Sequence, residues 1–194
     1  MQSAQSVSGD SWRALGKLLT ALALAYASYL LMTGLRVKEL LEAVLPIALP
    51  FKSLAVFGGF MYILWIVLAY RLCGSGFGVV TALIASSLCL ASSPWFGVAS
   101  PWWFSVYGVL SFLAAGILCE RVHGALANAV FGSINWVAAF VHHVAPLTAS
   151  GLAIGLALAA LSGAVGDYIA RAAARALLSI DAVRSFYGTE HRSM

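Results

Sequence analysis

The stretch "NAVFGSINWVAAFVHH", residues 128–143, combines an apolar run of helical length with polar side chains at a regular spacing. Asn128, Asn135 and His142 follow one another at intervals of seven residues, among residues that are mainly Ala, Val, Phe and Ile. Seven residues make close to two turns of an α-helix, so the three polar side chains share one face. A polar group without a partner is unfavourable in hydrocarbon, so this face should point into a helix bundle or a wet cavity.

The composition of the whole chain agrees with a membrane environment. The chain has 194 residues, of which 62% are hydrophobic and 9% charged, whereas an average globular domain has about 25% charged residues. Several apolar runs have about twenty residues, the length that a helix needs to cross a bilayer. The sequence therefore predicts an all-α, polytopic protein of the lipid bilayer, with residues 1–194 as one integral membrane domain.

The apolar runs predict six transmembrane helices in one bundle. Their ranges are 15–34, 54–72, 77–93, 102–119, 124–144 and 149–178. The first run also has features of a signal peptide, because Arg13 and Lys17 precede it and Ala25-Tyr26-Ala27 resembles a cleavage site. The run stays apolar as far as Met32, which favours a span.

The distribution of Lys and Arg predicts that both termini are cytoplasmic. With six spans, the side that holds the termini carries eight of these residues, and the opposite side carries only Arg36, Lys38 and Lys52. Positive charge concentrates on the cytoplasmic side of membrane proteins. This topology in the cell membrane accounts for the net charge of +4, so we expect no nucleic-acid partner.

The polar residues of 128–143 allow structural and functional interpretations. Asn128, near the inner end, fits a hydrogen bond that joins helices. Asn135 fits that role or a contact to a ligand equally well, and His142 and His143 fit interfacial exposure or ligand contact. Because adjacent helical residues point about 100° apart, the two histidines cannot easily hold one ion, and we expect no metal and no cofactor.

Aromatic residues gather in "SSPWFGVASPWWFSVYG", residues 92–108. Trp95, Trp102 and Trp103 fit a belt at the membrane interface. They also fit an apolar pocket for a flat ring, with the Tyr107 hydroxyl one turn further in. Both interpretations stay open at this point.

The sequence gives little support for catalysis. Ser133 follows Gly132, but no GxSG stretch and no phosphate-binding GxxxxGK[ST] loop is present. The deepest acids, Glu120 and Asp167, stand beside Arg121 and Arg171, which predicts ion pairs at the inner helix ends.

Small residues recur at intervals of four on the first and the sixth span, which allows helix backbones to approach closely. The first span carries two such pairs, Ala21 with Ala25 and Ala23 with Ala27. The sixth span carries a longer stripe of Gly151, Gly155, Ala159 and Gly163.

Three stretches carry a resemblance to a known family: "ALALAYA" (21–27), "SFLAAGILCERVHGALANAVFGSINW" (111–136) and "SGAVGDYIARAAARALL" (162–178). With the six spans, the long first outer connection and the basic tail, the chain resembles the substrate-binding S component of energy-coupling factor (ECF) transporters. The resemblance covers most of the chain. It implies a small solute, usually a vitamin or precursor, which is captured from outside in the outer half of the bundle.

The resemblance also implies partners, namely a transmembrane T subunit and two cytoplasmic ATPase subunits. The alanines of the first span would be among the contacts to the T subunit. We expect a solute-binding subunit that is not itself an enzyme, and the alternatives are a small intramembrane enzyme or a scaffold that binds only other membrane proteins. The residues expected to bind the solute are Trp102, Trp103, Tyr107, Asn135, Trp136, His142 and Lys52.

Overall fold

The computed structural model describes residues 3–34, 52–92, 102–143 and 148–187, and every element in these ranges is a helix. The elements are α1 (Ser3–Gly34), α3 (Lys52–Gly58), the π-helix η1 (Gly59–Ile63), α4 (Leu64–Cys73), α5 (Phe77–Ser92), α6 (Trp102–Arg121), α7 (Gly124–Val141), α8 (Ala149–Leu178) and α9 (Asp181–Tyr187). The all-α prediction is confirmed for this part of the chain.

Four helical stretches are long and apolar enough to cross a membrane: Ser11–Gly34, Ser53–Cys73, Gly124–Val141 and Ala149–Leu178. The apolar helix Phe77–Ala91 is shorter. These stretches support a multi-pass membrane protein, and they fall within four of the ranges expected from sequence to within a few residues.

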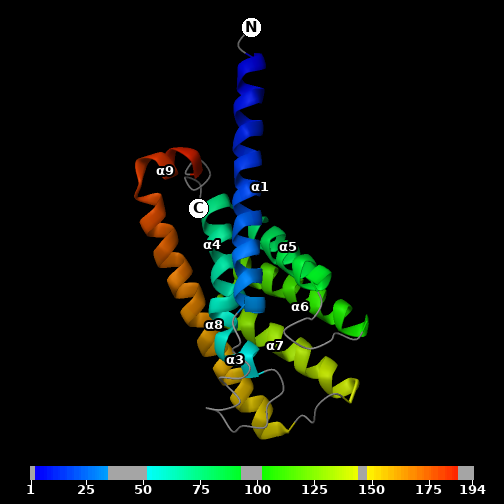
Figure 1. Ribbon diagram of the computed structural model, residues 1–194. Helices are drawn as coiled ribbons and strands as arrows, with labels where there is room; N and C mark the ends of the chain where they lie inside the picture. The colour runs from blue at the N-terminus through cyan, green and yellow to red at the C-terminus, as the bar shows by residue number, and fades with distance from the viewer. Residues whose placement is uncertain (1–2, 35–51, 93–101, 144–147, 188–194) are drawn as a thin grey trace.

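The second span lies at the centre of the bundle. It consists of α3, η1 and α4 in direct succession, and 67% of its most apolar window is buried, against 22% for α1 and 28% for α8. In Figure 1, α5, α6 and α7 spread away from one side of α4, whereas α8 lies on its other side. The short α9 turns from the end of α8 toward α1, and the Tyr187 hydroxyl lies 2.6 Å from Thr20 Oγ1.

A π-helical turn interrupts the second span at Gly59. Such a turn departs from the regular i→i+4 pattern, so its backbone groups need other partners inside a membrane protein. The Gly59 N–H donates to Ser162 Oγ of α8 at 2.9 Å, and the Ser28 hydroxyl of α1 donates to the Met61 carbonyl at 2.8 Å. Side chains from two neighbouring helices therefore bind the turn.

Glycines bring α8 against its two neighbours. A Cβ at Gly59 or Gly166 would overlap backbone of the opposing helix, and a Cβ at Gly124 would lie 2.7 Å from the Gly163 carbonyl oxygen. The stripe expected on this helix is buried in full, together with Gly166, Asp167, Ala170 and Ala174 further along. It serves packing within this chain.

Three aromatic rings fill the centre of the bundle between the second span, α6 and α7. Tyr62, Phe112 and Phe131 are fully buried. Their ring centroids lie 4.3 to 5.6 Å apart, within the range of favourable aromatic pairs. The cluster joins the second span to α6 and α7.

Candidate functional site

The charged residues gather at one end of the bundle, where α4 and α6 end and α7 begins. We call this the arginine end, after Arg71, Arg121 and Arg171. The opposite end, where α6 begins and α7 ends, holds Tyr107 and His142. The two ends differ in how their polar groups are satisfied.

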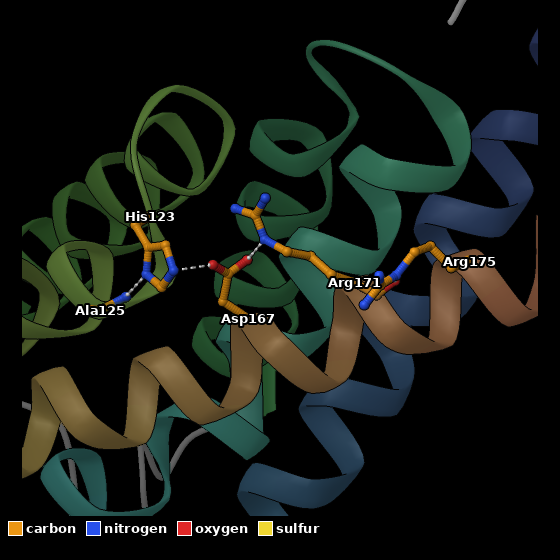
Figure 2. A network of polar contacts seen from close by, with 5 residues as sticks. All are labelled: His123, Ala125, Asp167, Arg171 and Arg175. Atoms are coloured by element: carbon orange, nitrogen blue, oxygen red, sulfur yellow. Dashed lines mark hydrogen bonds and ion pairs between the residues drawn. The ribbon is translucent and has the colours of Figure 1, made fainter.

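A buried carboxylate joins two helices at the arginine end (Figure 2). Asp167 of α8 has no exposed surface, and its Oδ1 accepts a hydrogen bond from Arg171 Nε at 2.8 Å. Its Oδ2 lies 2.9 Å from His123 Nε2, a close polar contact whose geometry falls short of a hydrogen bond. The expected pairing of Asp167 with Arg171 is confirmed, and the contact to His123 adds a link across helices.

His123 also caps α7, and this second contact fixes its tautomer. Its Nδ1 accepts a hydrogen bond from the Ala125 N–H at 3.1 Å, as Figure 2 shows. A nitrogen that accepts carries no proton, so in the neutral ring the proton is on Nε2 and faces Asp167. The same side chain thus satisfies the start of α7 and ties it to α8.

The expectation that Glu120 pairs with Arg121 is wrong. The carboxylate instead accepts from two backbone groups near the start of α5, from the Gly76 N–H at 2.9 Å and the Val79 N–H at 3.1 Å. Adjacent helical residues point in different directions, and the free N–H groups of a helix start attract a carboxylate.

Asn128, in the first half of α7, connects this helix with two others. Its Oδ1 accepts a hydrogen bond from the Tyr62 hydroxyl of η1, and its Nδ2 donates to the Ala159 carbonyl of α8 at 2.8 Å. Both ends of the amide are occupied by other helices. The interpretation of Asn128 as a residue that holds the bundle together is therefore confirmed.

Asn135 is equally buried but is satisfied only in part. Its Nδ2 donates to the Phe131 carbonyl, one turn back in the same helix, at 2.8 Å. Its Oδ1 has no hydrogen-bond partner among the residues that the structure describes. The Thr81 and Ser86 hydroxyls share this property, but they belong to α5, which packs on α1, α4 and α6.

Trp136 stands next to Asn135 and fills a helix interface. The ring has no exposed surface and packs with Ala55 of α3 and Ala159 of α8. Leu152, Leu156 and Leu158 complete this cluster. In the conformation described, Trp136 closes the space between these helices.

Tyr107 and His142 come together at the end opposite the arginines. Their rings meet edge to face with centroids 5.8 Å apart, and both side chains are half-buried. Tyr107 also borders a hollow of about 600 Å³ between α6 and α7. The rest of its lining is Leu110, Leu113, Ala114, Ile117, Ser133, Ile134 and Val137.

The other expected solute contacts lie at or beyond the edge of the described structure. The backbone of Lys52 begins α3, and that of Trp102 and Trp103 begins α6; their side chains, like the whole of Trp95, lie outside the described part. Their contribution to a site stays a prediction.

The four alanines expected to meet a partner divide into two pairs. Ala21 and Ala25 have no exposed surface and pack inside the chain's own bundle. Ala23 is exposed and Ala27 half-buried. Only Ala23 and Ala27 are thus open to a partner in this conformation.

The remaining polar groups give limited chemical options. Ser133, a candidate nucleophile by residue type, donates its hydroxyl to the Ala129 carbonyl at 2.8 Å. Among the described residues, no group of three or more His, Cys, Asp or Glu side chains comes close enough together to hold a metal ion.

Sequence reasoning missed His123 and Tyr62, because single polar residues in or next to an apolar run give no spacing to detect.

Comparisons of this chain with protein-family models, with curated proteins and with solved structures find no match.

Proposed function

We propose that this chain is a solute-binding membrane subunit of the ECF type, which captures a small solute from the side opposite the arginine end. One observation supports this most: Asn135 places an amide oxygen with no described partner in the interior, while Asn128 uses both ends of its amide for packing. A buried acceptor without a partner is unfavourable. A solute that donates a hydrogen bond would remove this penalty.

The surroundings of Asn135 suit a small, partly aromatic solute. Tyr107 and His142 lie at the same end of the bundle and carry both ring faces and polar atoms. Ligand sites in proteins are typically apolar with a few polar groups that set orientation. In this proposal Asn135 orients the solute, and Tyr107, His142, Trp102 and Trp103 surround it, with Lys52 at the entrance.

In the same proposal, Trp136 controls access to the interior next to Asn135. Its ring occupies the space beside Ala55 and Ala159. A rotation of this ring away from Ala55 and Ala159 would open the interior next to Asn135.

Six spans with both termini in the cytoplasm are part of the proposal. The three native cysteines are buried, so single cysteines added at the surface report on topology with little background. A membrane-impermeant thiol reagent applied outside should label cysteines placed at Lys38 and Ala99. It should spare one at the exposed Ser75, between α4 and α5; labelling there from outside would contradict the topology.

A T subunit and two ATPases are the proposed partners, with the T subunit meeting α1 at Ala23 and Ala27. Ala23→Trp should abolish co-purification with a T subunit and leave the chain folded, because this side chain is exposed. Ala25→Trp is the contrasting variant and should prevent folding, since Ala25 has no exposed surface. Retention of the T subunit by Ala23→Trp would remove this face from the proposal.

The decisive test of the class is the purified chain itself. A solute-binding subunit should carry a stoichiometric small molecule that mass spectrometry can identify after extraction. A scaffold would bring down proteins and no such molecule, and an enzyme would lose turnover on mutation of Ser133, His142 or Glu120. Either of the latter results would replace the proposed function.

A further inference from the structure

A second pocket, separate from the proposed solute site, opens at the arginine end between α4 and α8. Its volume is about 410 Å³. Arg71 comes from α4, and the rest of the lining comes from α8: Arg171, Ala174, Arg175 and Leu178. The described lining thus holds three guanidinium groups and no acidic side chain.

Arg171 is held in place by the buried network beside the pocket. Asp167 engages the Nε of Arg171, and Figure 2 shows the other two guanidinium nitrogens turned away from that carboxylate. Arg175 follows one turn later, with its Nε 3.4 Å from the Arg171 carbonyl. An arginine that is already oriented loses less freedom when it binds a ligand.

The composition of the lining favours an anion, because three of the five described lining residues are arginines and none is acidic. Like charges brought to one pocket repel each other, and a bound anion relieves this repulsion. Planar guanidinium forks match the oxygen atoms of phosphate, to which they donate paired, charge-assisted hydrogen bonds.

The position of the pocket adds to the argument. Ala174 is buried and Leu178 half-buried, so the arginines stand over an apolar floor. In the proposed membrane arrangement the ends of α4 and α8 lie at the depth of lipid head groups, and basic pockets between helices at that depth bind anionic head groups. We propose that this pocket binds a phosphate group, from an anionic phospholipid or from a soluble phosphate.

A simpler account assigns these arginines to the helix ends alone. Arg71 and Arg175 do lie in the last turns of α4 and α8, where a positive charge is favourable. That account does not explain Arg171, which lies about two turns before the end of α8. The helix-end account also gives no reason why arginines of two helices, α4 and α8, line the same pocket.

The test uses the full chain in a neutral detergent, titrated with short-chain phosphatidylglycerol and, separately, with inorganic phosphate. Binding to the folded state raises the thermal midpoint in a concentration-dependent way. Arg175→Gln and Arg71→Gln should each weaken binding about fivefold, the effect of one basic residue near an anionic surface. The matched control is Arg121→Gln, which removes the same charge from an exposed position at the same end, outside the pocket.

Each outcome decides between the alternatives. Stabilisation by both probes identifies the phosphate group as the ligand, and stabilisation by phosphatidylglycerol alone identifies a lipid head group. Stabilisation by neither probe would overturn the proposal. So would an Arg121→Gln variant that binds as weakly as Arg175→Gln, because attraction would then follow total charge rather than the pocket.

Discussion

Asn128 and Asn135 lie on the same face of α7 and are equally buried, but they have different surroundings. Asn128 is bound from both sides by other helices, through Tyr62 and Ala159. Asn135 donates only within its own helix, and its Oδ1 has no partner in the described part of the chain. The comparison indicates that Asn128 serves packing between helices, whereas Asn135 keeps a buried acceptor that no described residue satisfies, and we propose that the solute supplies its partner.

The largest effect is expected where α8 meets the π-helical turn. In Gly166→Ala the new Cβ would overlap the Gly59 backbone, and backbone cannot move aside as a flexible side chain can. We expect a loss of more than about 4 kcal/mol, as for other severe overpacking, and therefore loss of the folded protein. Size-exclusion chromatography and thermal unfolding would measure this.

Gly34→Ala is the control for this substitution, because a Cβ at Gly34 meets nothing within 4 Å. It should leave the elution profile and the unfolding midpoint unchanged. A folded Gly166→Ala protein of normal stability would show that the bundle does not depend on the close approach of α8 to the turn at Gly59.

The next effect concerns the buried carboxylate. Asp167→Asn removes the charge that holds His123 and Arg171, and we expect a loss of about 2 to 3 kcal/mol. The value lies at the low end for a buried pair because the side chains of His123 and Arg171 are 50% and 35% exposed. Chemical denaturation in detergent would measure the free energy of unfolding.

Asp181→Asn is the matched control for the carboxylate. Its side chain is 88% exposed and pairs with Arg184 on α9, so its loss should change stability by at most about 0.5 kcal/mol. Equal effects of the two substitutions would mean that the network of Figure 2 contributes no more than a surface pair.

A smaller effect on stability should separate the two asparagines. Asn128→Ala removes two hydrogen bonds between helices and should lower the free energy of unfolding by about 1 to 2 kcal/mol. Asn135→Ala removes only a bond within α7 and should lower it by about 0.5 kcal/mol or less. A larger loss for Asn135→Ala would indicate that this residue, too, serves packing.

The sequence predicted the helical class well because apolar runs and their ends are local signals. The range 149–178 matches α8, and 77–93 and 102–119 differ from α5 and α6 by one or two residues at one end. The π-helical turn at Gly59 was not predicted, since it depends on Ser162 and Ser28 from other helices.

The site was predictable only in part for the same reason. The spacing of seven placed Asn128 and Asn135 on one buried face of α7, whereas His142 follows the end of that helix. Spacing cannot tell which amide finds partners across the bundle. The predicted pairing of Glu120 with Arg121 was wrong, because the sequence does not show that the start of α5 lies next to Glu120 in space. The arginine pocket joins residues about a hundred positions apart, beyond the reach of any local pattern.

The most direct test of the account measures how much small molecule remains bound to each asparagine variant. The molar ratio of co-purified solute to folded chain should be stoichiometric for the native protein and unchanged for Asn128→Ala. For Asn135→Ala it should fall in line with an affinity loss of about 1 to 3 kcal/mol, the penalty for an unpaired buried partner. Full occupancy in Asn135→Ala, or an equal loss in both variants, would contradict the claim that the half of the bundle opposite the arginines holds the solute.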